Sequence, residues 1–293
     1  MRKQQVIKTE LVATLATILC FVAASADAQF GRGGPDPSAS EAPTPRLADG
    51  KPDMTGSWRR VAGGAQGSGG GMFRRCSPFQ NENCMEWTNQ SADWTFMASS
   101  RLDPNLPLYR PEHWDKVQAL NMWTNRDDPV MTCLPLGIPR QGAPGRIFHT
   151  ENDMTMIYRG GVDGAGGYAE FRMVSLDKTE HNENDEYAYS YFGRAAVSWE
   201  GETLVLNSIG FTDETWFGRG GYFHTDQTRI VEKFTRTGNE MIYEVTVDDP
   251  SVLIEPWVLT PQVLQLSGNA TIIAERGSCT DTELHNVSSQ IRH

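Results

Sequence analysis

The stretch Gln227-Thr-Arg-Ile-Val-Glu-Lys-Phe-Thr-Arg-Thr-Gly-Asn-Glu-Met-Ile-Tyr-Glu-Val-Thr-Val247 decides the fold class of this chain. It holds two runs rich in β-branched and aromatic residues, 227–236 and 240–247, on either side of Thr237-Gly238-Asn239. Two such runs around a short turn that contains glycine are typical of a β-hairpin. The pattern recurs through the second half of the chain, and we expect further strands at 146–150, 154–159, 168–175, 186–192, 195–199, 203–209, 257–266 and 270–276.

Strands spaced at about ten residues and joined by short turns predict an antiparallel sandwich or barrel. Residues 111–121 are the best helix candidate, because Pro111 suits a first helical turn and Glu112 suits the helix dipole. The sequence has neither a strand–helix–strand rhythm nor a Gly-x-Gly-x-x-Gly loop, which excludes the usual dinucleotide-binding architecture. We therefore expect a mainly β protein with one short helix and long N-terminal loops, in which residues 51–293 form a single domain.

The charge of the chain excludes some classes of partner. The 293 residues include 26 Lys and Arg against 37 Asp and Glu, which gives a formal net charge of −11. An acidic protein is a poor match for the phosphate backbone of nucleic acids and for an anionic membrane surface. A small molecule is the partner that the sequence favours, and the oligomeric state stays open.

Residues 1–28 have the pattern of a secretory signal peptide. The start is basic, an apolar run over 11–24 follows, and Ala26-Asp27-Ala28 then places small residues before a cleavage site. A membrane anchor is the alternative, but the apolar run is shorter than the roughly 20 residues that a spanning helix needs. We expect export to the periplasm or the medium, no membrane span in the mature chain, and a flexible tether over 29–50.

Four cysteines follow the predicted cleavage site, and an even number in an exported protein suggests disulfides. Three connectivities are possible. We favour Cys76–Cys84, which closes a short local loop, together with Cys133–Cys279, which ties the middle of the chain to its C-terminus. A zinc site is the alternative, but no Cys-x-x-Cys spacing supports it.

The segment 210–232 is the best candidate for a functional site, because it crowds polar side chains among aromatic residues. If His224 and Asp226 lie on a strand, their side chains share one face, and the carboxylate can orient the imidazole as a general base. Asp213 is a second candidate for the orienting or acidic role. The alternative is structural: Asp213 caps a turn, and His224 and Asp226 are hydrogen-bonded at a strand start. Substrate-binding candidates are Trp216, Phe223, Tyr189 and Arg219.

His224-x-Asp226 also permits a metal site. A two-His-one-carboxylate set binds iron in non-haem oxygenases, and a second histidine is available as His285 or His149. Zinc on His149, His224 and Asp226 is a lesser form of this hypothesis. Our main expectation is a protein without metal or cofactor.

Two parts of the sequence resemble known families. Gly56-Ser57-Trp58 is similar to the Gly-x-Trp step that opens lipocalin-like barrels. The block Trp199-Glu-Gly-Glu-Thr-Leu-Val205, Gly210-Phe-Thr-Asp-Glu-Thr-Trp216 and His224-x-Asp226 resembles a widespread family of exported bacterial proteins of uncharacterised function. The motifs Asp127-Asp-Pro129 and Asp248-Asp-Pro250 match the same family. The resemblance implies export and one continuous β-rich domain, brings no activity, and with the strand pattern favours a lipocalin-like barrel.

The leading functional hypothesis is an exported enzyme that performs acid–base chemistry without a cofactor on a small, largely apolar molecule in a barrel cavity. Isomerase, lyase, dehydratase and cyclase reactions all fit, with His224 as the base, Asp226 or Asp213 as its partner, and Trp216 as a pocket wall. A periplasmic binding or carrier protein without turnover is the alternative. The metal-dependent enzyme is the third hypothesis. Converging polar side chains in the cavity would favour an enzyme, and outward-facing ones a carrier.

Overall fold

The computed structural model describes residues 36–63, 73–75, 85–87, 107–122, 127–132, 134–158, 170–218 and 221–268. The chain divides into two units, Met1–Gly33 and Gly34–His293, and all of the described residues belong to the second. The predicted signal peptide over 1–28, the two predicted disulfides, and residues Arg219 and His285 lie outside the described residues and stay predictions. Within the described part, no helix is long and apolar enough to cross a membrane.

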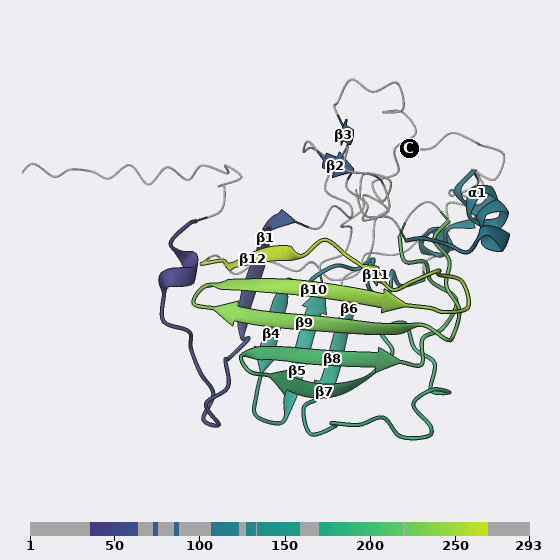
Figure 1. Cartoon of the computed structure of the whole chain (residues 1–293). Coiled ribbons are helices and arrows are strands. Elements are labelled where there is room, and N and C mark those ends of the chain that lie inside the picture. The colour runs from purple at the N-terminus through teal and green to yellow at the C-terminus, as the bar shows by residue number, and fades with distance from the viewer. Residues whose placement is uncertain are drawn as a thin grey trace, which may run out of the picture. The chain divides into compact units, whose positions relative to one another are not determined.

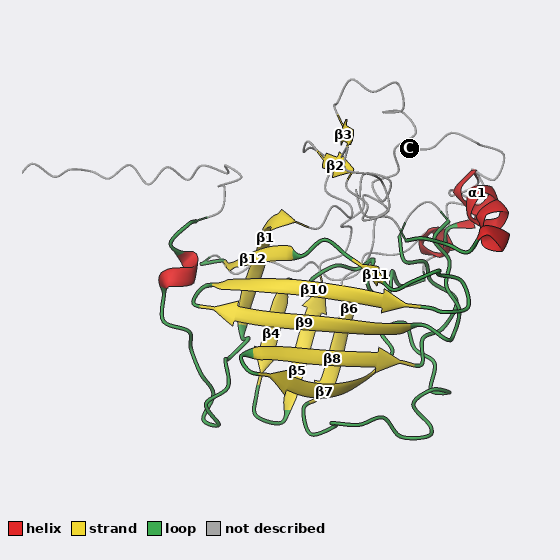
Figure 2. Ribbon diagram, viewed as in Figure 1, coloured by secondary structure: helices red, strands yellow, loops and turns green. Residues whose placement is uncertain are grey.

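The described chain is mainly β (Figures 1 and 2). Within the described residues, the helical elements are one α-helix, α1 (Trp114–Met122), and three short 3₁₀ helices, η1 (Ala39–Glu41), η4 (Pro111–His113) and η5 (Pro129–Thr132). The strands are β1 (Gly56–Gly63), β2 (Phe73–Arg75), β3 (Met85–Trp87), β4 (Arg146–His149), β5 (Asp153–Tyr158), β6 (Glu170–Ser175), β7 (Arg194–Glu200), β8 (Thr203–Ile209), β9 (Arg229–Thr237), β10 (Glu240–Asp248), β11 (Trp257–Val258) and β12 (Gln262–Leu266).

Ten strands form one antiparallel sheet in the order β6-β5-β4-β1-β12-β10-β9-β8-β7, with β11 added beside β10, while β2 and β3 pair separately. Figure 2 shows β7 to β10 as one layer, with β4, β5 and β6 crossing behind it. The two layers face each other, because Arg172 of β6 forms an ion pair with Glu232 of β9. The sheet is therefore a nearly closed barrel. This confirms the predicted fold class and is consistent with a lipocalin-like barrel.

The core follows from the alternation of side chains along the strands. On β9 the side chains at every second position, from Ile230 to Arg236, are buried, and β10 alternates in the same way. The hairpin expected from the opening stretch is confirmed, with Glu240 opposite Thr237 and Asp248 opposite Arg229. The inner faces of both layers join in one hydrophobic cluster that includes Trp58, Phe234 and Tyr243.

The described part of the predicted tether, residues 36–50, is instead fixed to the sheet. The backbone N–H of Asp36 donates to the side chain of Gln265 at 2.8 Å, and the Gln265 amide donates back to the Asp36 carbonyl at 2.8 Å. Thr44 accepts a hydrogen bond from the N–H of Gly238 in the β9–β10 turn. The composition of this segment cannot form a core of its own, but its polar groups find partners on a core built elsewhere.

A second correction concerns the tyrosine-rich stretch 186–192, which was expected to be a strand. Its residues form turns, with a single bridge between Ser190 and Phe211. Tyr187 and Tyr189 are exposed, and neither lies in a strand. Aromatic β-propensity is overridden here by local turns, one of which is closed by the hydrogen bond from the N–H of Tyr187 to the carbonyl of Asn184 at 3.2 Å.

Candidate functional site

The structure places His224 in the turn between the Trp216–Phe223 bridge and β9, where its ring is buried. Nδ1 lies 3.0 Å from the carbonyl oxygen of Thr225, and Nε2 lies 2.7 Å from the hydroxyl of Thr215. Because a carbonyl can only accept, Nδ1 carries the proton and the Thr215 hydroxyl donates to Nε2. Both ring nitrogens are therefore occupied by hydrogen bonds within the protein.

A buried carboxylate supports the same turn. Asp249 accepts hydrogen bonds from the N–H of Thr225 at 2.8 Å and from the hydroxyl of Thr228 at 2.9 Å. The Thr228 hydroxyl also lies 3.2 Å from Nδ1 of His224. The polar chain thus runs from Thr215 through His224 and Thr228 to Asp249, and it joins three of the sequence motifs within the segment 210–250.

Burial lowers the pKa of His224, and the hydrogen bond to the Thr225 carbonyl and the negative charges of Asp249 and Asp213 offset this only in part. The ring of Phe217 stacks on the imidazole with centroids 4.9 Å apart. The imidazole is thus neutral, enclosed and fully hydrogen-bonded. Such a histidine holds a turn in place, and it could act as a base only if the Thr215 hydroxyl moved away from Nε2.

The other predicted catalytic residues do not converge on His224. Residues 224–228 are not part of a strand, so the condition under which His224 and Asp226 share a face is not met. The Asp226 carboxylate accepts a hydrogen bond from the hydroxyl of Tyr189 at 3.1 Å, and the carbonyl of Thr225 takes the orienting role expected of Asp226. Asp213 is exposed.

The aromatic residues that were expected to form a pocket wall, Trp216 and Phe223, lie in the hydrophobic core instead. Trp216 and Phe223 are both buried and are bridged to each other by backbone pairing. The hydroxyl of Tyr109 donates to the carbonyl of Phe223, and the rings of these two residues lie 5.4 Å apart. These side chains therefore pack in the core, where they stabilise the turn that carries His224.

The described residues contain no cluster of side chains that would support the predicted metal site. Within that part of the chain, no group of three or more His, Cys, Asp or Glu side chains is placed to hold an ion. Nδ1 of His149 accepts a hydrogen bond from the N–H of Met54 at 3.1 Å, and its ring stacks on Trp199. His149 thus fixes the start of β1 rather than meeting His224.

Glu232, at the end of the candidate segment 210–232, belongs to a polar network inside the barrel whose other members the sequence did not indicate. Arg172 of β6 donates to Glu232 and, at 2.6 Å, to the hydroxyl of Ser208. The hydroxyl of Tyr243 donates to the second carboxylate oxygen of Glu232 at 2.9 Å. Burial and the negative charge of Glu232 raise the pKa of Tyr243, so its phenol stays protonated. A charged residue at an inward position of an alternating strand is the signal that could have identified this network.

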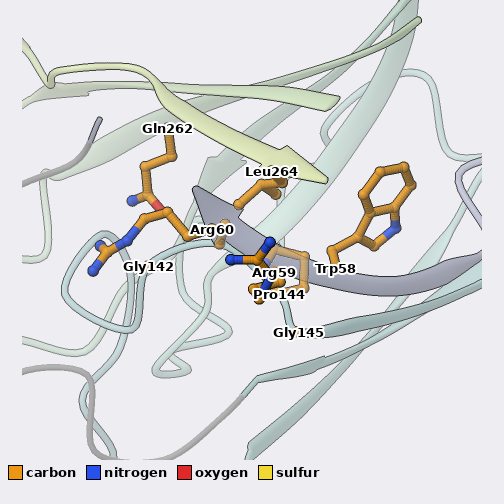
Figure 3. A pocket seen from close by; sticks show the side chains of 9 residues that line it. Trp58, Arg59, Arg60, Gly142, Pro144, Gly145, Gln262 and Leu264 are labelled. Carbon is orange, nitrogen blue, oxygen red and sulfur yellow. The ribbon is translucent and has the colours of Figure 1, made fainter. Parts of the chain in front are cut away.

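An open pocket of about 230 Å³ lies between β1, β12 and the segment 142–145 (Figure 3). Trp58 and Leu264 belong to the hydrophobic core, so the pocket reaches the inner face of the sheet. Figure 3 shows the side chains of Arg60 and Gln262 extending toward the same side of the pocket, beside Gly142. The lining residues are Trp58, Arg59, Arg60, Gly142, Ala143, Pro144, Gly145, Gln262 and Leu264.

A bulge in β1 lies at this pocket. Arg60 is opposite Leu264, whereas Ala62 is opposite Val263, so Val61 is an extra residue on β1. Bulges are frequent at barrel rims and beside sites, where they redirect a side chain. Burial lowers the pKa of Arg60. The guanidinium nevertheless remains charged, because the pKa of an arginine side chain lies far above neutral pH.

Comparisons of the chain with protein-family models, with curated proteins and with solved structures gave no match. The resemblance to exported bacterial proteins therefore stays a prediction, and the functional argument depends on the geometry alone.

The two buried histidines predict a pH dependence of stability. Burial lowers the pKa of both His149 and His224 below 6.5, so the unfolded chain binds more protons than the folded one as the pH falls. The free energy of unfolding should therefore decrease below pH 6.5, by up to about 1.4 kcal/mol per pH unit for each histidine. Urea unfolding between pH 7 and pH 5 measures this slope. His149→Asn and His224→Asn should each flatten it, and an unchanged slope in both variants would contradict the prediction.

Proposed function

We propose that this protein is an exported small-molecule binding protein and that its site is the pocket between β1, β12 and the segment 142–145. The observation that carries the proposal is the open space of about 230 Å³ on the inner face of the barrel sheet. Small β-barrels hold single ligands in this way, and ligand sites are concave and mostly apolar with a few polar groups.

The chemistry of the pocket walls supports binding. Trp58, Pro144 and Leu264 offer apolar surface, and the Gln262 amide adds hydrogen-bonding capacity to it. Trp58 is held in place, because its indole N–H donates to the carbonyl of Met54 at 3.0 Å and its backbone N–H donates to Gly145 at 2.9 Å. A wall fixed in this way loses little conformational freedom when a ligand binds.

Binding without turnover is favoured over acid–base catalysis by the state of His224. Its two nitrogens are engaged by Thr215 and Thr225, while Asp213 is exposed and Asp226 is hydrogen-bonded to Tyr189 instead. A general base needs a free lone pair within reach of its substrate. The group proposed from the sequence as the base therefore supports the carrier hypothesis better than the enzyme hypothesis.

Blocking the pocket tests the proposal. Ala143 lines the pocket and is half-buried, so Ala143→Trp should fill the space while leaving the sheet intact. Full-length protein is produced with residues 1–28 and recovered from the periplasm, where we expect a mature chain beginning at Gln29. A library of small apolar acids, amides and alcohols is then screened by thermal shift and by calorimetry. We expect ligands that bind the wild-type protein and lose at least about tenfold in affinity in Ala143→Trp.

Glu183→Trp is the matched control, because it adds the same ring at an exposed position outside the pocket lining. Its ligand affinities should equal those of the wild type. The proposal fails if no library member binds, or if ligands bind the Ala143→Trp variant as tightly as the wild type. Turnover of a bound ligand that disappears in His224→Asn would restore the acid–base hypothesis instead.

A further inference from the structure

We propose that the ligand of this pocket carries a single carboxylate on a compact apolar body, and that Arg60 binds the carboxylate. The inference rests on the proposed binding function, which it extends by naming the class of ligand. Two observations carry it: the position of Arg60 on the inner face of the barrel, and the combination of charge and apolar surface among the lining residues.

The position of Arg60 follows from the pairing of β1 with β12. Directly opposed residues of an antiparallel pair place their side chains on the same face. Arg60 is opposite Leu264, whose side chain is buried in the core, so the Arg60 side chain leaves the sheet on the inner side. The extra residue Val61 follows immediately, and a bulge of this kind bends the strand beside Arg60, which lines the pocket.

Gln262 completes the polar part of the pocket. It lies two residues before Leu264 on β12, so it shares the inner face, and only 7% of it is exposed. In Figure 3 its side chain and that of Arg60 are drawn on the same side of the pocket. A guanidinium presents paired N–H donors that match the two oxygens of a carboxylate, and a neighbouring amide can donate one more hydrogen bond.

The other lining residues limit the rest of the ligand. Among the nine described residues that line the pocket, none is acidic, two are arginines, and Trp58, Ala143, Pro144 and Leu264 are apolar. A volume of about 230 Å³ holds a single ring or a short branched chain. The net charge of −11 disfavours ligands with several negative charges, such as nucleotides. A compact apolar monocarboxylate satisfies all three conditions.

Matched pairs of acid and amide test the inference directly. Calorimetric titrations at pH 7 use benzoate, phenylacetate, cyclohexanecarboxylate and hexanoate, each beside its own carboxamide. The two members of a pair have nearly the same shape and differ in charge. We expect at least one acid to bind the wild-type protein at least about tenfold more tightly than its amide, because a hydrogen bond to a charged group is stronger than one between neutral groups.

Variants then assign the preference to one side chain. Arg60→Gln should bring the acid down to the affinity of its amide, and Arg60→Lys should retain part of the preference, because it keeps the charge and loses the paired donors. Lys233→Gln is the control: it also removes one positive charge, but from an exposed lysine paired with Glu200. It should leave both affinities within about twofold of the wild type.

The outcomes separate this inference from the proposed function. Equal binding of acids and amides in the wild type, or an acid preference that persists in Arg60→Gln, overturns the carboxylate assignment while the binding function stands. Failure of every acid and every amide to bind, together with no binder in the wider library, overturns the binding function itself. An acid preference lost in Arg60→Gln and kept in Lys233→Gln supports both.

Discussion

Replacing Glu232 by Gln is expected to destabilise the folded protein by about 3–5 kcal/mol. The carboxylate of Glu232 is fully buried and is the ion-pair partner of Arg172, whose side chain is only 4% exposed. The variant leaves the Arg172 guanidinium inside the barrel without its counter-charge. A buried charge without a partner is among the most destabilising changes that a single substitution can make.

Urea unfolding at pH 7 measures this effect, and a second glutamate on the neighbouring hairpin provides the control. Glu200 pairs with Lys233 at 2.7 Å, but both side chains are exposed. Glu200→Gln should therefore change the free energy of unfolding by less than about 1 kcal/mol. The double variant Arg172→Met, Glu232→Leu removes both charges and should recover much of the lost stability. Equal effects of Glu232→Gln and Glu200→Gln would contradict this account of the barrel interior.

Gly210→Ala is the second substitution with a large expected effect, roughly 2–5 kcal/mol of destabilisation. Gly210 follows β8 with a φ of +71°, and a Cβ placed on it would lie 2.1 Å from the backbone oxygen of Asp185. That oxygen cannot move freely, because the Asp185 carboxylate is bound by Lys178 and by the N–H of Asn182. The alanine thus suffers both an unfavourable backbone conformation and a collision with backbone.

Gly201 separates these two causes. It has a similar φ of +62°, but a Cβ placed on it meets no atom within 4 Å. Gly201→Ala should therefore cost only the conformational part, about 1–2 kcal/mol. Thermal and urea unfolding of both variants give the difference. If Gly210→Ala is no more destabilising than Gly201→Ala, the close approach of the chain at Asp185 is not as described.

The strands could be predicted from the sequence where the signal is local. The hairpins over 194–209 and 229–248 were expected because alternating runs flank short turns, and these features need no knowledge of the rest of the chain. The anchoring of residues 36–50 could not be predicted in this way. Asp36 and Gln265 are 229 positions apart, and only the closed arrangement of the sheet brings them together.

The candidate site shows the same limit. The sequence named His224 as a candidate base, but the local pattern does not specify the partners that determine its chemistry. Thr215 lies nine positions before His224, and Asp249, which supports the same turn through Thr225 and Thr228, lies 24 and 21 positions after them. Arg172 and Glu232 are 60 positions apart and look like ordinary surface charges until the strand faces are known. The pocket depends on the register of β1 against β12, which a bulge at Val61 alters and which no local pattern specifies.

The most direct test of the central claim is a crystal structure of the protein with the most tightly binding carboxylate of the matched set. We expect the ligand between β1 and β12, with its ring or chain against Trp58 and Leu264 and its carboxylate within about 3 Å of the Arg60 guanidinium. A ligand bound instead beside His224, with the Thr215 hydroxyl displaced from Nε2, would contradict this account and would return the search to acid–base catalysis.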